Sequence, residues 1–140
     1  MSAFALVVNP ISGSGLGRKY GKELEIELRT QGLTTHYVSG SSLEETLNAL
    51  SHVLISQDID VILSVGGDGL AHHLFPVAIK HSKAIYVVPA GTGNDFARTT
   101  GSYGLSAKET ISRILKTKPE FIDMGKIHHQ GNDIWFGQVL

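Results

Sequence analysis

The sequence predicts an α/β domain of three layers, in which helices cover both faces of a mostly parallel β-sheet. Short apolar runs alternate with longer segments that carry apolar residues at helical spacing, which is typical of repeated strand–helix units. With 140 residues, 41% of them hydrophobic, the chain can bury one sizeable core. Three glycine-rich loops each follow an expected strand, so we expect all three at the carboxyl edge of the sheet, where such sheets bind ligands.

The expected strands of the sheet are short apolar runs, as in strands that are buried on both faces. They comprise residues 4–8, 34–38, 61–65 and 85–88. The expected helices comprise residues 18–31, a segment that begins at Ser42, residues 71–80 and residues 106–115.

Local signals predict where these helices begin and end. Gly32 ends the first helix. Two others open with capping boxes, Ser42 with Glu45 and Ser106 with Glu109.

A leucine stripe and a proline mark the two helices in the middle of the chain. In the first of these helices, the apolar stripe consists of Leu43, Leu47, Leu50 and Leu54. In the second helix, Pro76 either kinks the helix or marks a late start for it.

Composition and charge exclude several classes of function. The net charge of −1 argues against a nucleic-acid partner, and the lack of cysteine excludes disulfides and thiolate zinc sites. No apolar run approaches the roughly 20 residues of a transmembrane segment, so we expect a cytoplasmic protein with peripheral membrane contact at most. The pairs His72-His73 and His128-His129 are expected to be solvated surface residues rather than metal ligands.

The first glycine-rich loop, residues 9–17, favours phosphate binding over a merely flexible turn. Gly13, Gly15 and Gly17 allow the backbone to approach an oxyanion, and the following helix adds the positive end of its dipole. The spacing matches neither a dinucleotide-binding fingerprint nor a Walker A loop.

The second loop, Gly66-Gly67-Asp68-Gly69, comes directly after a buried strand. Glycines at the end of a strand let a ligand lie against the backbone. A carboxylate at Asp68 can hold Mg²⁺ beside phosphates or accept a proton from a substrate hydroxyl. The alternative is a tight turn in which Asp68 caps the next helix.

The third loop, residues 89–98, is rich in hydrogen-bond donors. Gly91 and Gly93 permit close approach of a ligand, while the Thr92 hydroxyl and the N–H groups near Asn94 can donate to phosphate oxygens. A loop that only reversed the chain would not need this density of donors.

Four segments of the chain, taken in order, carry a resemblance to a known family. They are Asn9-Pro10-x-Ser12-Gly13, Gly66-Gly67-Asp68-Gly69, Pro89-Ala90-Gly91-Thr92-Gly93-Asn94-Asp95-Phe96-Ala97-Arg98 and Ile122-Asp123-Met124-Gly125. They resemble the diacylglycerol kinase catalytic-domain family, which includes bacterial diacylglycerol kinases, sphingosine kinases and ceramide kinases. The resemblance implies a lipid kinase that uses ATP and Mg²⁺ on a lipid at the membrane surface, with a fold like the N-terminal domain of phosphofructokinase and NAD kinase.

The resemblance also implies roles for particular residues. It makes Asp68 the catalytic residue and a Mg²⁺ ligand, directly or through water. The nucleotide-binding residues that it implies are Asn9, Pro10, Ser12, Gly13, Ser39, Gly66, Gly67, Asp68, Gly69, Gly91, Thr92, Gly93 and Asn94. The chain departs from the family at Leu70, where threonine is usual, and at His72 and His73, where asparagine and glutamate are frequent.

The end of the chain changes from strand–helix alternation to a hairpin. A strand region begins at residues 120–124, and residues 130–132 form a turn between residues 125–129 and 134–140. We therefore expect residues 1–125 to form the nucleotide-binding domain and residues 126–140 to begin a second, β-rich domain that this chain lacks. Exposed apolar surface there would favour a homodimer or self-association.

Two other functions remain open at this stage. One is a kinase of the same fold that acts on NAD or a sugar phosphate, although the third loop favours a lipid. The other is a non-catalytic regulator that binds nucleotide. In the kinase interpretation the 140 residues alone are expected to be inactive, because ligand sites commonly lie between two domains.

Overall fold

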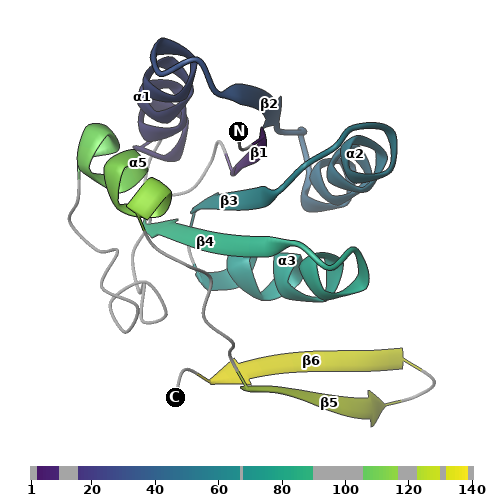
Figure 1. Ribbon diagram of the computed structural model, residues 1–140. Helices are drawn as coiled ribbons and strands as arrows, with labels where there is room; N and C mark the ends of the chain where they lie inside the picture. Colours follow the sequence, from purple (N-terminus) through teal and green to yellow (C-terminus); the bar gives the residue numbers. More distant parts are fainter. Residues whose placement is uncertain are drawn as a thin grey trace.

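The computed structural model describes residues 3–9, 16–66, 68–89, 106–116, 123–129 and 132–138, and for Leu16, Asp68, Pro89 and residues 123–138 it describes the backbone. Strands and helices alternate along the first 116 residues, and a separate hairpin follows them (Figure 1).

Four parallel strands form the central sheet, in the order β2-β1-β3-β4. They are β1 (Ala3–Val8), β2 (Thr34–Val38), β3 (Val61–Gly66) and β4 (Ala84–Pro89). β1 pairs with β2 on one side and with β3 on the other, and β3 also pairs with β4. The central strands β1 and β3 are therefore neighbours, and their carboxyl ends lie side by side at one edge of the sheet.

Helices cover both faces of this sheet. The helices are α1 (Leu16–Thr30), α2 (Leu43–Ser56), α3 (Asp68–Lys80) and α5 (Ala107–Lys116). α1 and α5 pack on one face, and α2 and α3 pack on the other (Figure 1). The predicted three-layer α/β fold is confirmed.

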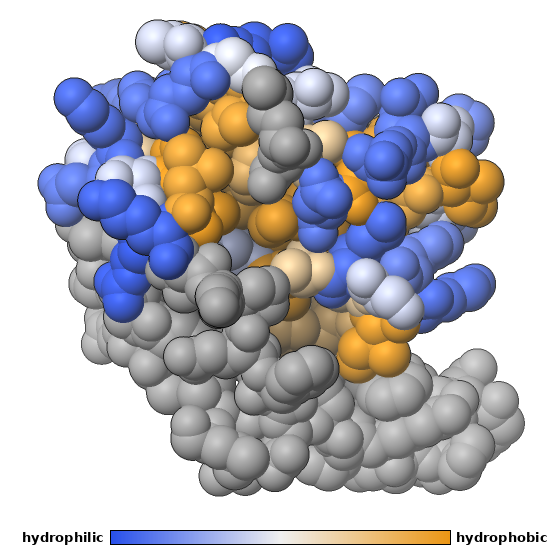
Figure 2. All heavy atoms as spheres, in the orientation of Figure 1, coloured by the Kyte–Doolittle hydropathy of each residue, from blue (hydrophilic) through white to orange (hydrophobic). Residues whose placement is uncertain are grey.

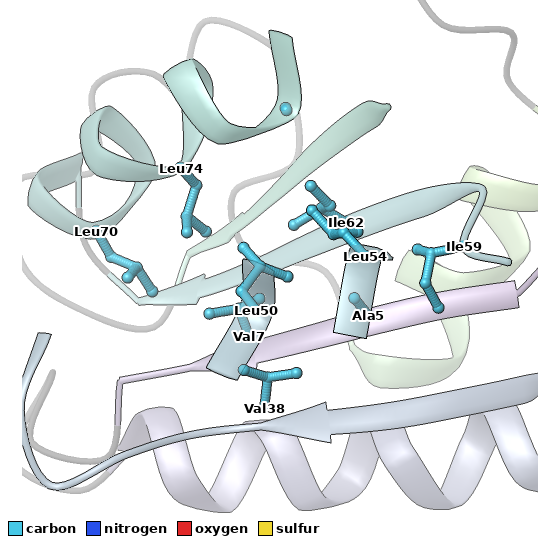
Figure 3. Packing of buried hydrophobic residues seen from close by; sticks show 10 residues of the cluster. Ala5, Val7, Val38, Leu50, Leu54, Ile59, Ile62, Leu70 and Leu74 are labelled. Carbon is cyan, nitrogen blue, oxygen red and sulfur yellow. The ribbon is translucent and has the colours of Figure 1, made fainter. Parts of the chain in front are cut away.

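The alternation of side chains along β1 shows why two helical layers are needed. Phe4, Leu6 and Val8 are fully buried against α1 and α5, whereas Ala5 and Val7 are fully buried on the opposite face. On that opposite face, leucines of α2 and α3 converge on residues of β1 and β3 (Figure 3). A strand buried on both faces must be apolar at successive positions, as the sequence of β1 is.

The predicted ends of α1 and α2 are confirmed. Gly32, directly beyond α1, has a φ of +76°, a conformation that glycine adopts without strain. At the start of α2, the Ser42 hydroxyl accepts a hydrogen bond of 3.1 Å from the Glu45 backbone N–H. The Glu45 carboxylate accepts from Ser41 rather than from Ser42, so the capping box is displaced by one residue.

Two expectations about the helices were wrong. α3 begins at Asp68 rather than at residue 71, so Pro76 does not mark a late start but lies inside the helix. The helix tolerates the proline because its residues Leu70, Leu74 and Ala78 are buried against the sheet. The leucine stripe of α2 is shorter than predicted, because Leu43 is 40% exposed.

The last described segments form an antiparallel hairpin of β5 (Asp123–His129) and β6 (Asn132–Gln138). The predicted hairpin is confirmed, although β6 begins at Asn132, which pairs with His129. α3 is the helix nearest to β6 (Figure 1).

Among the residues whose side chains the structure describes, the larger exposed apolar side chains are spread over four helices. They are Ile26, Leu43, Ile55, Ile79 and Leu115. Figure 2 shows hydrophobic side chains on one face interspersed among hydrophilic ones. Within the described part of the chain, no helix combines the length and the apolar character needed to cross a bilayer.

A hydrogen bond joins a side chain of α1 to the backbone of the outermost strand of the sheet. The Arg29 guanidinium of α1 donates a hydrogen bond of 3.1 Å to the backbone carbonyl of Thr35 in β2. β2 ends the strand order on this side, so this carbonyl belongs to an edge strand.

Truncation of two apolar residues of α2 tests which of its faces supports the core. Leu50→Ala is expected to lower the free energy of unfolding by about 2–5 kcal/mol, because Leu50 is fully buried. Ile55→Ala should change it by no more than about 0.5 kcal/mol, because Ile55 is 76% exposed. Urea unfolding followed by circular dichroism measures both, and similar losses in the two variants would contradict the packing described.

Candidate functional site

Two predicted site residues meet where the central strands end. The backbone N–H of Asn9 donates to the carbonyl of Val65 at 3.1 Å, which extends the pairing of β1 with β3 by one residue. Gly66 lies beside it, because a Cβ at Gly66 would be 3.4 Å from the Cβ of Asn9 and 3.0 Å from Cδ2 of Leu70. The structure thus brings together the start of the first loop and the start of the second.

The N-terminus of α3 lies at the same edge. Only residue 67 separates the end of β3 from Asp68, the first residue of α3. The first turn of a helix has N–H groups without intrahelical partners, and the helix dipole makes this end positive. Gly69 is exposed, and a Cβ built on it would meet no other described residue within 4 Å. The backbone of this turn is therefore open to an anion.

The turn between β2 and α2 also lies at the carboxyl edge of the sheet, and hydrogen bonds hold it in place. The Ser39 hydroxyl donates to the carbonyl of Val8 at 2.9 Å, which ties the turn to the end of β1. The backbone N–H of Gly40 donates to the buried Oγ1 of Thr46 at 3.0 Å. The proton of Ser39, a predicted nucleotide contact, is thus committed to the protein, while its oxygen can still accept.

Glu45 completes the turn by binding Ser41. The Ser41 backbone N–H donates to the Glu45 carboxylate at 2.9 Å, and the Ser41 hydroxyl donates to the same oxygen at 2.6 Å. The hydrogen bond from the Ser41 side chain, followed by the one from its backbone, lowers the pKa of Glu45. The folded state prefers the ionised carboxylate, so this stabilisation is present above the usual carboxyl pKa and is lost as the pH falls through the lowered pKa.

These hydrogen bonds limit what the turn can bind. Its N–H groups at Gly40 and Ser41 already have partners, so they are not available to a phosphate in the way that the first turn of α3 is. The turn instead offers hydroxyl oxygens and carbon surface.

A hollow lies between this turn and α3. It measures about 410 Å³ when the part open to solvent is included. Its lining comes from the end of β1, the turn and the first residues of two helices: Asn9, Gly40, Ser41, Ser42, Leu43, Thr46 and Leu70. Its enclosed volume is about 100 Å³, below the roughly 300–1,000 Å³ typical of pockets for small molecules, which combine apolar walls with a few polar groups. The leucines and the serine hydroxyls give this hollow that character.

Sequence reasoning missed part of this wall. Gly40 is required here, since a Cβ would come within 2.7 Å of the Glu45 Cβ and 2.9 Å of the Thr46 backbone nitrogen. Thr46 was missed as well, although it interrupts the leucine stripe of α2 and is only 4% exposed. A polar residue at a core position was the available signal.

The predicted site residues divide into two groups. Asn9, Ser39, Gly66, Asp68 and Gly69 all lie at the carboxyl edge. The others lie outside the described residues: Pro10, Ser12, Gly13, Gly67, Gly91, Thr92, Gly93 and Asn94.

The residues that depart from the family occupy two different environments. Leu70 is 5% exposed, joins the core between α2 and α3, and lines the hollow. His72 and His73 are exposed, as predicted, and the His72 ring meets Phe75 edge-on with centroids 6.2 Å apart. Among the side chains that the structure describes, no group of three or more acidic or histidine residues could enclose a metal ion.

Solved structures share this fold. A crystal structure of a diacylglycerol kinase from Bacillus anthracis str. Sterne matches with a TM-score of 0.70 and 19% identity, over 94% of this chain and 45% of that chain. A putative diacylglycerol kinase from the same organism also gives a TM-score of 0.70, with 20% identity, over 94% of this chain and 47% of that one. The expected phosphofructokinase- and NAD kinase-like class of fold is confirmed.

Comparison of the sequence with known families identifies the family, whereas the solved structures show the fold. Residues 3–127 match the diacylglycerol kinase catalytic domain, and the chain belongs to this family. A diacylglycerol kinase of Mycobacterium tuberculosis is 28% identical over 134 residues, which cover 95% of this chain and 43% of that protein. One from Bacillus subtilis strain 168 is 22% identical over 132 residues, covering 93% of this chain and 43% of that protein. The chain thus spans less than half the length of these relatives.

Replacing Gly40 and Gly69 by alanine, one at a time, should show by their different effects on stability that the backbone is crowded at Gly40 and open at Gly69. Gly40→Ala is expected to lower the free energy of unfolding by about 1–3 kcal/mol, because its Cβ would clash with backbone and Cβ atoms. Gly69→Ala should be neutral or stabilise by up to about 1 kcal/mol, since helices favour alanine and the space is free. Chemical denaturation measures both effects, and a loss at Gly69 as large as at Gly40 would contradict this geometry.

Proposed function

We propose that this chain is the ATP-binding part of a lipid kinase that transfers the γ-phosphate of ATP to the hydroxyl of a diacylglycerol-like lipid. Membership of the diacylglycerol kinase catalytic-domain family supports the lipid kinase class. The observation that carries the ATP assignment is the open first turn of α3 at Gly69, beside the adjoining ends of β1 and β3.

The site supports a particular placement of the nucleotide. Its phosphates lie against the first turn of α3, where unpaired N–H groups and the helix dipole favour negative charge. The nucleoside lies in the neighbouring hollow, whose walls at Leu43 and Leu70 suit a flat apolar ring and whose hydroxyls suit a ribose or the edge of a base. Pro10, Ser12, Gly13 and residues 91–94 complete the phosphate site from the first and third loops.

Asp68 is the residue that fits a Mg²⁺ ion. Carboxylate oxygen is a ligand that Mg²⁺ prefers, and Asp68 begins the helix whose N-terminus faces the phosphates in this placement. Mg²⁺, held by Asp68 directly or through water, neutralises charge on the phosphates. In the transfer, a bond forms between the lipid hydroxyl oxygen and the γ-phosphorus, the bond from that phosphorus to the β–γ bridging oxygen breaks, and the hydroxyl proton passes to a base. Asp68 is the candidate for that base.

The proposal also includes a second domain and contact with the membrane that contains the lipid. In this view residues 126–140 begin a β-rich domain, ATP is enclosed between the two domains, and the enzyme is cytoplasmic with peripheral contact at the membrane. Residues 1–140 alone then bind nucleotide weakly, phosphorylate no lipid and self-associate.

One observation favours a second function. Leu70 places a buried apolar side chain where relatives usually have threonine, so the site lacks that hydroxyl. A non-catalytic nucleotide-binding regulator would tolerate this loss better than an enzyme would.

Asp68→Asn in the full-length protein tests the catalytic assignment. The variant is expected to lose at least about 100-fold in kcat, because asparagine removes the charge needed to bind Mg²⁺ or accept a proton. Transfer of labelled phosphate from ATP to mixed micelles of diacylglycerol, sphingosine and ceramide provides the measurement and identifies the lipid. Asp58→Asn, before β3 and therefore at the opposite edge of the sheet, serves as the matched control and should keep its activity. Near-normal turnover of the Asp68 variant would make Asp68 a turn residue only.

Nuclear magnetic resonance titration of residues 1–140 with millimolar Mg-ADP tests the nucleotide site directly. The largest amide shifts are expected at Asn9, Gly40 and Gly69. Gly69→Ala should raise the Kd at least about 10-fold without loss of stability, because its methyl group would occupy the space of a phosphate. Shifts confined to the opposite edge, around Asp58 and Asp60, would refute the proposed site.

A further inference from the structure

Hydrogen bonds within the protein decide how the hydroxyls that line the hollow can meet a ligand. The Thr46 hydroxyl donates to the carbonyl of Ser42 at 2.8 Å, and the Ser41 hydroxyl donates to the Glu45 carboxylate at 2.6 Å. Both hydroxyls line the hollow, and with their protons engaged they can only accept a hydrogen bond from a ligand. Thr46 is 4% exposed, whereas Ser41 is exposed, so Ser41 is the acceptor that a ligand reaches more easily.

The Glu45 carboxylate sets the direction of the hydrogen bond at Ser41. The bonds from the Ser41 hydroxyl and then from the Ser41 N–H lower the pKa of Glu45, so the carboxylate is ionised at neutral pH and has no proton to donate. The hydroxyl must therefore be the donor. The N–H of Ser41 binds the same carboxylate oxygen at 2.9 Å, which holds the residue at two points.

This arrangement changes what the Ser41 oxygen prefers to bind. A hydroxyl that donates to a carboxylate becomes a better acceptor, because hydrogen bonds in a chain polarise one another. The negative charge of Glu45 beside it also disfavours a phosphate at this position. Ser41 is thus suited to a ligand group that donates a hydrogen bond and carries no negative charge.

The neighbouring turn has the opposite preference. Leu70 lines the hollow and directly follows Gly69, where the first turn of α3 offers N–H donors to an anion. Donors on one side and an acceptor on the other match the two ends of a nucleotide. Phosphate oxygens accept hydrogen bonds, whereas ribose hydroxyls and the amine of adenine can donate them.

We propose that Ser41 accepts a hydrogen bond from the nucleoside, and that Glu45 is the positioning residue that makes it an acceptor. The donor is a ribose hydroxyl or the exocyclic amine of the base. The inference rests on the proposed function, because it assigns the hollow to the nucleoside of a bound nucleotide. Glu45 is not among the residues that line the hollow, so it acts through Ser41. Together the two residues orient the nucleotide, since a phosphate is accepted at α3 and rejected at Ser41.

Three variants of the full-length protein test this inference. Ser41→Ala removes the acceptor, and Glu45→Ala removes the carboxylate that orients it. Glu44→Ala is the matched control, because it removes another exposed carboxylate from the same first turn of α2. Urea unfolding establishes that each variant is folded under the assay conditions.

The ligands distinguish the possible donors of the nucleoside. Calorimetry gives the Kd of each protein for Mg-ADP and for three analogues. Two of them lack the ribose 2′-hydroxyl or the 3′-hydroxyl, and the third, the diphosphate of purine riboside, lacks the amine of adenine. Each analogue thus removes one donor and leaves the phosphates unchanged.

The expected result is a change in selectivity. The wild type should bind one analogue about fivefold more weakly than ADP, the scale of one net hydrogen bond, and that analogue identifies the donor. Ser41→Ala should bind ADP about fivefold more weakly than the wild type does and should bind ADP and that analogue equally. Glu45→Ala should reduce the preference for ADP to less than about twofold, because its Ser41 hydroxyl is free to rotate. Glu44→Ala should keep the full preference.

A merely structural role cannot produce this pattern, because a loss of stability affects ADP and its analogues alike. If the wild type binds ADP and all three analogues equally, Ser41 accepts no hydrogen bond from the nucleoside. If the preference survives in Ser41→Ala, another group recognises the donor. If Glu44→Ala loses the preference as Glu45→Ala does, the effect belongs to the charge of the turn and not to the bond at Ser41.

These results are distinct from a failure of the proposed function. Any of the three overturns the inference on Ser41 and Glu45 while binding of Mg-ADP by the wild type leaves the proposed function standing. A wild type that binds no Mg-ADP removes both.

Discussion

Burial of β1 and β3 on both faces is the constraint on which the rest of the structure depends. These strands are neighbours in the middle of the sheet and send alternate side chains into two helical layers. Their parallel pairing brings Asn9 and Gly66 to the same edge and directs the start of α3 toward it. The geometry of the candidate site is therefore a consequence of how the core is packed.

The sequence predicted the fold well because its main signals are local. Apolar runs give the four strands of the sheet to within one residue at either end, and Ser42 and Gly32 gave correct helix boundaries. The early start of α3 was signalled only by Asp68 as a candidate helix cap, and the continuation of the helix through Pro76 runs against the helix preference of proline. Burial of Leu70 and Leu74 against the sheet outweighs that preference, and this burial is a tertiary effect.

The candidate site was only partly predictable for the same reason. Glycine-rich loops after strands indicate an edge that can bind an anion, and Asn9, Gly66 and Gly69 do lie there. The hollow depends instead on the approach of the α2 turn to α3, which no short motif encodes. Likewise, the commitment of the Ser39 proton to Val8 arises from a contact between residues 31 positions apart.

The bond from Arg29 to the Thr35 carbonyl bears on how copies of the protein can associate. An exposed edge strand is a template for sheet extension, in which a strand of another molecule adds to the row of free backbone groups. The Arg29 guanidinium binds a carbonyl of the outermost strand and so brings a positive charge to that strand. Self-association of this domain is therefore disfavoured along β2, so continuous intermolecular sheets should not grow from that side of the molecule.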